Sequence, residues 1–399
     1  MSTIKDGDDR IAYDAPVSKS SIYMDHHATT PCDPAVVEAM LPFFSEQFGN
    51  AASRFHTHGK QARHAVEKAR LQIATLIGAN PREIVFTSGA TESLNLALQG
   101  LARARTTPGH FVSTNIEHPA VLDTLKALEA EGHSVTLVNV DPSGFVSPEA
   151  IEEAITEKTM AVCVIGASNE IGTIQPLAHI ADVTRPRGIP LISDTTQWVG
   201  NMSLDVNALG VDMATLSAHK LYGPKGIGCL YVRRRRPAIA LAELTHGGGH
   251  ERGLRSGTLN VPGIVGFGAA AVLCSQQSTA DAARMAALRD TLLAGLTSRL
   301  TGVHVNGSMD SRLSNNLNVS IQGVEGRKLM EHLPEVALST GSACSSAEAE
   351  PSHVIRALGF GDARAVTALR FGLGRHTTQA EVDDVVERVV QACLEIRQS

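Results

Sequence analysis

The sequence predicts an α/β fold built on a mostly parallel, seven-stranded sheet, with a smaller α+β unit toward the carboxyl-terminal end. Two observations support this prediction. Short, continuously apolar runs alternate with segments of helical periodicity along the first part of the 399 residues, and such runs are typical of strands that are buried on both faces. Beyond about residue 270 the alternation gives way to one long helical pattern followed by isolated strands, which indicates a different layout.

The apolar runs define the predicted strands in order. They cover residues 84–87, 111–113, 135–138, 161–165, 190–193, 213–216 and 228–232. Helical patterns between them, such as 61–78 and 119–132, would cover the faces of the sheet. In the last part of the chain we predict a helix over 280–300, strands near 315–320 and 368–372, and a final helix over 378–396. That helix should begin at Thr378, with Glu381 three residues later to complete a capping box.

These patterns predict a large domain over residues 21–270 and a small domain over 271–399. The first residues of the large domain are expected to pack with the small one. Residues 1–20 are polar and acidic, so we expect a disordered extension and not a signal peptide. The formal charge of -6 gives no general attraction to nucleic acid, and no apolar run reaches the ~20 residues that span a membrane. Six cysteines without a Cys-x-x-Cys pair favour reduced thiols and a cytoplasmic location.

Polar side chains follow five of the predicted strands. The segments are Ser88 to Glu92, Glu117-His118, Ser168 to Glu170, Asp194 to Gln197, and Ser217 to Lys220. Because functional sites of parallel sheets lie beyond the carboxyl ends of the strands, we expect these side chains to converge.

Lys220 and Asp194 suggest what such a site could hold. A lysine just beyond a buried strand could bind pyridoxal 5'-phosphate (PLP) as a Schiff base, and an aspartate could keep the pyridine nitrogen protonated. Backbone N–H groups at a helix start near Ala90, with the hydroxyl of Thr91, could hold the phosphate. Taken alone, these two residues fit an ordinary helix cap better. The sequence contains no Walker A pattern, which argues against a nucleotide phosphate.

Three further side chains allow two interpretations each. His118 could lie over an aromatic cofactor and move protons, or it could only cap a helix. Arg370, in a predicted strand, could hold a substrate carboxylate with two parallel bonds or form a structural ion pair. Cys344 lies among small, polar residues that favour exposure of its thiol, which could be a nucleophile or a bystander.

Two glycine-rich motifs are assigned structural roles. His246 and His250 are separated by three glycines, which favour a loop over the helix that a zinc site of this spacing needs. Residues 266–271 formally match a dinucleotide fingerprint. They lack a βαβ context, so we predict close helix packing there.

Together these segments resemble the cysteine desulfurases of the NifS/IscS type, in the class V aminotransferase group of fold-type I PLP-dependent transferases. The resemblance covers nearly the whole chain after about residue 22. The matching segments are 24–31, 48–50, 87–92, 117–118, 169–172, 194–197, 217–228, 247–258, 341–345 and 370–375.

The resemblance implies a role for each matching residue at the cofactor ring. Lys220 corresponds to the Schiff-base lysine, and it would transfer protons together with His118. Asp194 corresponds to the partner of the pyridine nitrogen, and Gln197 to the donor for the ring hydroxyl oxygen. His118 corresponds to the histidine stacked on the ring, and Asn169 to a residue that contacts both cofactor and substrate.

The resemblance also implies a phosphate site that two chains share. Ala90, Thr91, Ser217 and His219 would hold the phosphate from the same chain. Thr258 corresponds to a threonine that reaches the phosphate of the neighbouring subunit, which implies a homodimer.

The substrate implied by the resemblance is L-cysteine, bound by Arg370, Asn169 and Asn50. Its sulfur would pass to Cys344 as a persulfide, leaving L-alanine, and then to a protein acceptor such as an Fe–S scaffold. No resident metal is expected, although Cys344 could transiently ligate an Fe–S cluster. A selenocysteine lyase, or a related PLP-dependent lyase, is the alternative.

Overall fold

The structure is a computed structural model that describes residues 21–340 and 351–398. The predicted extension over residues 1–20 lies outside the described residues, as does Cys344.

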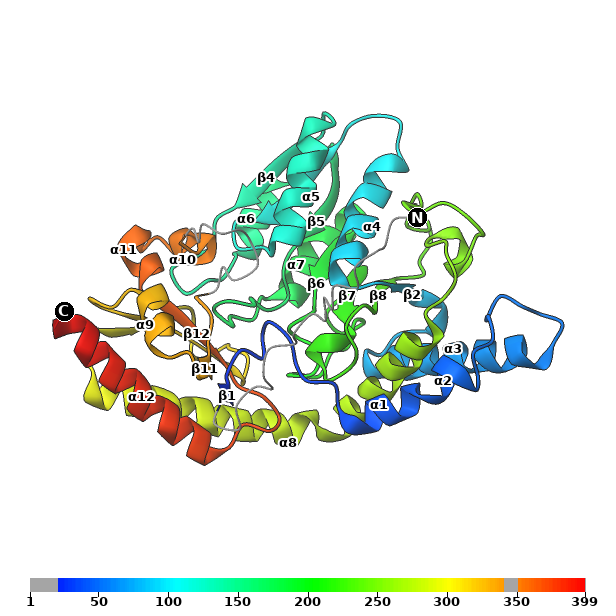
Figure 1. Ribbon diagram of the computed structural model, residues 1–399. Helices are drawn as coiled ribbons and strands as arrows, with labels where there is room; N and C mark the ends of the chain where they lie inside the picture. Colours follow the sequence, from blue (N-terminus) through cyan, green and yellow to red (C-terminus); the bar gives the residue numbers. More distant parts are fainter. Residues whose placement is uncertain (1–20, 341–350, 399) are drawn as a thin grey trace, which may run out of the picture.

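A seven-stranded sheet forms the centre of the larger part of the molecule (Figure 1). Its strands follow the order β2-β8-β7-β6-β5-β3-β4. Their bounds are β2 Ile84–Thr87, β3 His110–Thr114, β4 Ser134–Val138, β5 Thr159–Cys163, β6 Leu191–Asp194, β7 Met213–Ser217 and β8 Gly228–Val232. Only β8 among these strands runs antiparallel to its neighbours. The prediction of a mostly parallel sheet is therefore confirmed.

The position of β5 differs from the prediction by two residues. The apolar run 161–165 suggested the strand, but pairing covers Thr159–Cys163. Beyond Cys163 the chain leaves β3 but stays bonded to β6: the N–H of Val164 donates to the carbonyl of Ile192 at 3.0 Å, whereas the N–H of Ile165 donates to the side chain of Glu117 at 2.9 Å. Apolar character alone could not locate this exit, because the residues on both sides of it are buried.

Helices cover both faces of the sheet, and alternate residues of a strand enter different cores. On one face α4 (Ala90–Arg103) and α5 (Pro119–Ala130) form a core that includes Met213 of β7. The next residue, Ala214, packs into the larger core on the other face. The helices of that core include α3 (Thr57–Leu76), α6 (Pro148–Ala154), α7 (Leu177–Thr184) and the first part of α8 (Val261–Arg299).

The carboxyl-terminal part forms a second layered unit. Strands β9 (Val303–Val305), β10 (Asn316–Ile321) and β12 (Ala368–Gly372) make an antiparallel sheet in the order β12-β10-β9. A separate core is formed by this sheet with α9 (Gly326–His332), α12 (Gln379–Gln398) and the second part of α8. The short strand β1 (Ile22–Tyr23) pairs in parallel with β11 (Val336–Ala337), and Ile22 joins the same core. The remaining helices are α1 (Pro34–Met40), α2 (Pro42–Ser45), α10 (His353–Ala357) and α11 (Gly361–Val366).

Helix α8 connects the two parts, with α1 and α3 beside one end and α12 beside the other (Figure 1). The predicted helix over 280–300 is only its second part. The first part contains the glycine-rich residues 266–271, and a Cβ on Gly268 would lie 2.7 Å from the Cβ of Ala69 in α3. This close approach confirms helix packing as the role of the motif. The predicted division at residue 270 falls inside α8 and stays a prediction.

None of the helices in the described part of the chain has both the length and the apolar character that crossing a bilayer requires.

Candidate active site

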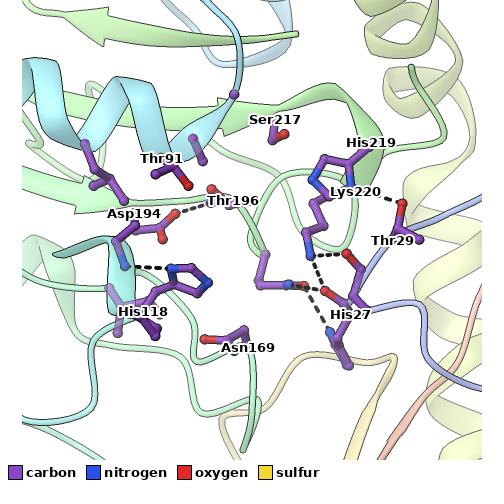
Figure 2. Close-up of a pocket in the computed structure, with 18 of the residues that line it drawn as sticks. His27, Thr29, Thr91, His118, Asn169, Asp194, Thr196, Ser217, His219 and Lys220 are labelled. Atoms are coloured by element: carbon purple, nitrogen blue, oxygen red, sulfur yellow. Dashed lines mark hydrogen bonds between the residues drawn. The ribbon is translucent and has the colours of Figure 1, made fainter. Parts of the chain in front are cut away.

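A cavity of about 560 Å³ lies at the carboxyl edge of the large sheet. All five strand ends that the sequence singled out contribute residues to its wall, as Figure 2 shows. Those residues are Ser88 to Glu92, His118, Asn169, Glu170, Asp194, Thr196, Gln197, Ser217, His219 and Lys220. The structure thus brings together side chains that are far apart in the sequence.

Lys220 ends the 3₁₀ turn η3 (Ala218–Lys220), which directly follows β7. Its Nζ donates to the carbonyl oxygens of His27 and of Ala28, the latter at 2.7 Å. Thr30 holds the turn, because its Oγ1 donates to the carbonyl of His219 and accepts from the N–H of Tyr222, both at 2.9 Å. The lysine head is therefore oriented within the cavity by backbone groups of the segment that precedes α1.

Asp194 ends β6 and is buried. Its Oδ1 accepts hydrogen bonds from the N–H of Thr196 at 3.0 Å and from Oγ1 of Thr215 at 3.1 Å. Among the described residues no donor reaches its other carboxylate oxygen. Since the residue lines the cavity, that oxygen is available to a cationic N–H of a bound ring.

His118 is the N-cap of α5, and its Nδ1 accepts from the N–H of Ala120 at 3.1 Å. Burial lowers the pKa of its imidazole, an effect that the nearby Asp194 opposes. The capping interpretation and the cavity interpretation both apply to this residue, because the capped ring also lines the cavity (Figure 2). A neutral imidazole with Nδ1 engaged carries its proton on Nε2.

Glu117, next to His118, is fully buried. Its Oε1 accepts from Oγ1 of Thr114 at 2.6 Å and from the N–H of Ile165 at 2.9 Å. Within the described part of the chain its Oε2 has no hydrogen-bond partner. Burial raises the pKa of this carboxyl to about 8, and the charge of Asp194 adds to the rise. Glu117 is thus a neutral acid at pH 7.

The start of α4 lies beside the end of β7. Its N-cap, Gly89, supplies no side-chain bond to the first turn. A Cβ on Gly228 of β8 would lie 2.7 Å from the Cα of Gly89, so glycine is needed for this close approach. Thr91 and Ser217 line the cavity there, and free N–H groups at a helix start attract a phosphate.

His219 completes this end of the cavity. Its Nδ1 lies 3.1 Å from Oγ1 of Thr29. Burial and the charges of Lys220 and Lys225 lower the pKa of His219 to about 4, so its ring is neutral at pH 7. The donors gathered here fit a phosphate, and the lysine and aspartate fit a pyridine aldehyde.

Arg370 of β12 also lines the cavity and is buried. Its Nη2 forms an ion pair with Oδ1 of Asp25 at 2.8 Å, and its Nη1 donates to the carbonyl of Asn169 at 2.9 Å. The predicted structural ion pair is therefore present. Among the described residues its buried Nε has no partner, and Nη1 and Nη2 each carry a second hydrogen that a carboxylate could accept.

Two predicted site residues lie outside the cavity of the single chain. Asn50 is exposed, and its Oδ1 accepts from the N–H of Ala52 at 2.8 Å in a local turn. Thr258 is exposed in the segment before α8. The roles of both stay predictions.

In the described ranges no group of three or more His, Cys, Asp or Glu side chains could hold a metal ion. The three glycines between His246 and His250 have positive φ values and form a loop, as the sequence predicted.

Several residues of the cavity wall were not singled out as site residues from the sequence, among them His27 and His353. His27 lies in the matching segment 24–31, but the resemblance implied no role for it. The Nε2 of His353 lies 3.1 Å from the carbonyl oxygen of Glu117. No local pattern marks these residues, because tertiary packing alone brings them to the cavity.

A lysine after β7, an aspartate after β6 and a phosphate-binding helix start at one sheet edge define a PLP-dependent enzyme of the aminotransferase class. Comparison with known proteins agrees. Residues 22–385 match the model of the family described as Aminotransferase class-V. The chain belongs to this family, whose members use PLP, and within it to the cysteine desulfurases of the IscS/NifS type.

Several relatives carry this assignment. Cysteine desulfurase IscS of Anaeromyxobacter sp. (strain Fw109-5) is 50% identical over 381 residues, which cover 95% of this chain and 94% of the relative. A solved structure described as a NifS-like protein has a TM-score of 0.87 at 36% identity, covering 93% of this chain and 98% of the other. A structure described as SspA in complex with cysteine has a TM-score of 0.79 at 37% identity, covering 90% and 100%.

Proposed function

We propose that this protein removes the sulfur of L-cysteine, giving L-alanine and a persulfide on Cys344. The observation that carries the proposal is the convergence of Lys220, Asp194 and His118 on one cavity with a guanidinium donor of Arg370. Bound PLP supplies an electron sink for negative charge at the substrate Cα.

Residues of this chain would hold the two ends of the cofactor. Asp194 would accept the N–H of the ring through the carboxylate oxygen that faces the cavity. The N–H groups at Ala90 and the hydroxyls of Thr91 and Ser217 would bind the phosphate. Lys220 would hold the aldehyde carbon until the substrate amine replaces it.

Arg370, Lys220 and His118 would act on the substrate. The carboxylate of L-cysteine would bind the guanidinium of Arg370, with Asn169 beside it. Lys220, once released, has an amine that can take a proton from the substrate Cα, and proton transfer by a positioned group accelerates such steps by about 10²- to 10⁴-fold. His118, neutral at pH 7, is the second group that can exchange a proton there.

Cys344 would take the sulfur as its thiolate, because the thiolate and not the thiol is the nucleophile. One S–S bond forms, the C–S bond of the substrate breaks, and the substrate carbon takes up a proton. The products are alanine and the persulfide of Cys344, so the atoms and electrons balance. A protein thiol, such as that of an Fe–S scaffold, would then accept the sulfur.

The test of this function is the yield of alanine and of sulfide from L-cysteine, with a thiol reductant present. We expect equal yields from the PLP-loaded protein and loss of both after Cys344→Ala. Cys32→Ala is the matched control, since Cys32 is a free, partly exposed thiol in the segment before α1, and it should leave both yields unchanged. Full yields from Cys344→Ala, or turnover of L-selenocysteine alone, would contradict the proposal.

A homodimer is part of the proposal. Three exposed phenylalanines lie on or near α2, namely Phe44, Phe48 and Phe55, with 63%, 66% and 97% of their surface accessible. Three large apolar side chains exposed within one short stretch of the chain favour an interface there. Thr258, exposed on its own chain, would reach the phosphate of the partner subunit.

A cytoplasmic location also belongs to the proposal. Cys32, Cys163, Cys229, Cys274 and Cys393 are all free thiols, as expected in a reducing compartment. A persulfide carrier also needs its cysteine reduced between turnovers.

A further inference from the structure

A continuous chain of side-chain hydrogen bonds runs from the small sheet to the cavity. Arg312 contacts Asn316 of β10, Asn316 contacts His27, and His27 contacts Gln197 beyond β6. The donor–acceptor distances are 2.8, 3.1 and 3.0 Å along this path. All four side chains are buried. Buried polar groups of this kind need satisfied partners, so the direction of each bond has a structural consequence.

At the cavity end a carbonyl group fixes the direction of the bonds. The backbone oxygen of His27 can only accept, and the side-chain amide of Gln197 meets it at 2.9 Å. The amide must therefore present its Nε2 to this oxygen and its Oε1 to the ring of His27. The Nδ1 of His27 must then carry the proton, since it faces an acceptor.

At the other end a guanidinium fixes the direction independently. Arg312 can only donate, so Asn316 must present its Oδ1 to Arg312 and its Nδ2 to the opposite side. That Nδ2 lies 3.1 Å from Nε2 of His27 and 3.1 Å from the carbonyl oxygen of Glu170, which also only accepts. The Nε2 of His27 must therefore be the unprotonated acceptor. Both ends of the chain demand the same tautomer.

Burial also keeps His27 neutral, as this arrangement requires. Desolvation and the charges of Arg370 and Lys220 lower the pKa of the imidazole to about 3, although the bond to Gln197 opposes the shift. A protonated ring would place a second donor against the N–H group of Asn316. The neutral ring is consistent with the bond directions that the geometry demands.

We propose that His27 is a positioning residue, which holds the amide of Gln197 so that an N–H and not the carbonyl oxygen is turned toward the bound cofactor. An amide nitrogen has two hydrogens, and the carbonyl of His27 takes one of them. The other remains for the cavity, which Gln197 lines. The inference rests on the proposed function, in which Gln197 donates to the ring hydroxyl oxygen of PLP. An amide turned the other way would place two oxygens against each other.

The first test reads the tautomer directly. Nitrogen NMR of ¹⁵N-histidine protein should show Nδ1 of His27 protonated and Nε2 unprotonated, with no titration between about pH 5 and 8. His27→Asn identifies the resonance by its loss. A proton on Nε2, or titration in this range, would overturn the inference. This result needs no turnover of L-cysteine, so it stands apart from any failure of the proposed function.

The second test measures the dissociation constant of PLP. His27→Leu removes the donor to Gln197. We expect the affinity for PLP to fall by roughly 2- to 10-fold, which corresponds to the free energy of one hydrogen bond. The visible absorption maximum of the bound PLP should also shift. His27→Asn keeps an N–H near the Nδ1 position and should restore both toward the wild-type values. His26→Asn is the matched control, because the neighbouring ring contacts the carbonyl of Gly372 and does not line the cavity. Wild-type affinity and spectrum in His27→Leu would contradict the role.

Discussion

Glu117 and His118 are adjacent in the sequence but differ in what the sequence could predict about them. The cavity position of His118 follows from its place just after a buried strand, and so do those of Lys220 and Asp194. The neutral state of Glu117 could not be predicted, because it depends on burial by segments remote in the chain. Thr114 and Ile165 supply only two hydrogen bonds to one of its oxygens.

The raised pKa of Glu117 predicts a pH dependence of stability. The folded state keeps the carboxyl protonated up to about pH 8, whereas the unfolded chain releases the proton near its usual value of 4.5. The folded state thus binds more protons between these values. The free energy of unfolding should fall as pH rises through this window, by up to about 1.4 kcal/mol per pH unit from this group, and the fall should end above the folded pKa.

Glu117→Gln isolates this effect, since the amide keeps an oxygen for Thr114 and Ile165 and cannot ionise. Urea unfolding at several pH values should show the variant gaining stability relative to the wild type as pH rises through the window. Parallel pH profiles for the two proteins would show that Glu117 is ionised in the folded state.

At the scale of elements, the segment between β8 and α8 is held by a buried ion pair. Glu251 accepts from Nη1 and Nη2 of Arg70 in α3, each at 2.7 Å, and from the N–H of Phe86 in β2 at 2.8 Å. Both charged side chains are at most 4% exposed. Glu251 and Arg252 have positive φ values of 48° and 59°, which non-glycine residues rarely adopt. The ion pair between Arg70 and Glu251 therefore offsets the backbone strain in this segment, which also carries Thr258.

Glu251→Gln should be strongly destabilising, because it removes the buried charge partner of the Arg70 guanidinium and leaves only Glu67, which is 58% exposed and lies 3.2 Å from its Nε. We expect a loss of about 3–5 kcal/mol in the free energy of unfolding, measured with urea. Glu387→Gln is the matched control, because it breaks the ion pair with Arg299. The side chains of Arg299 and Glu387 are 41% and 63% exposed, so this loss should have a far smaller effect on stability. Equal losses in the two variants would contradict a special role for the buried pair.

The ends of the helices show which elements the sequence could predict. For α12, Thr378 and Glu381 form the expected capping box: the N–H of Glu381 donates to Thr378 Oγ1 at 3.2 Å, and Glu381 accepts from the N–H of Thr378 at 2.7 Å. This cap is local, so the sequence predicted it. The start of α8 was missed because glycines at 263, 266 and 268 reduce the helical propensity of its first turns. Packing against α3 overrides that propensity.

At the scale of the whole molecule, the sequence predicted the mostly parallel sheet and the edge of it where the cavity lies. The contribution of a second chain to that cavity depends on the dimer. Thr258 provides a test through mixed dimers. If it serves the partner's site, a dimer of Lys220→Ala and Thr258→Ala chains holds one site with both residues intact. Random pairing in an equal mixture makes about half of the dimers mixed, and each mixed dimer has one intact site of two. Mixing the two variants should therefore restore alanine formation toward about a quarter of the wild-type value.

Each variant alone, refolded or exchanged in the same way, is the control for this experiment. Activity in the mixture no higher than the average of the two separate variants would show that Thr258 acts within its own chain or not at all.

The central claim is that sulfur passes to Cys344 itself. The most direct measurement is mass spectrometry of peptides from PLP-loaded protein after one turnover of L-cysteine without reductant, with alanine counted in parallel. We expect the Cys344 peptide to gain the mass of one sulfur atom for each alanine formed, and Cys344→Ala to form neither product. Alanine without added sulfur on that peptide, or added sulfur on another cysteine, would contradict it.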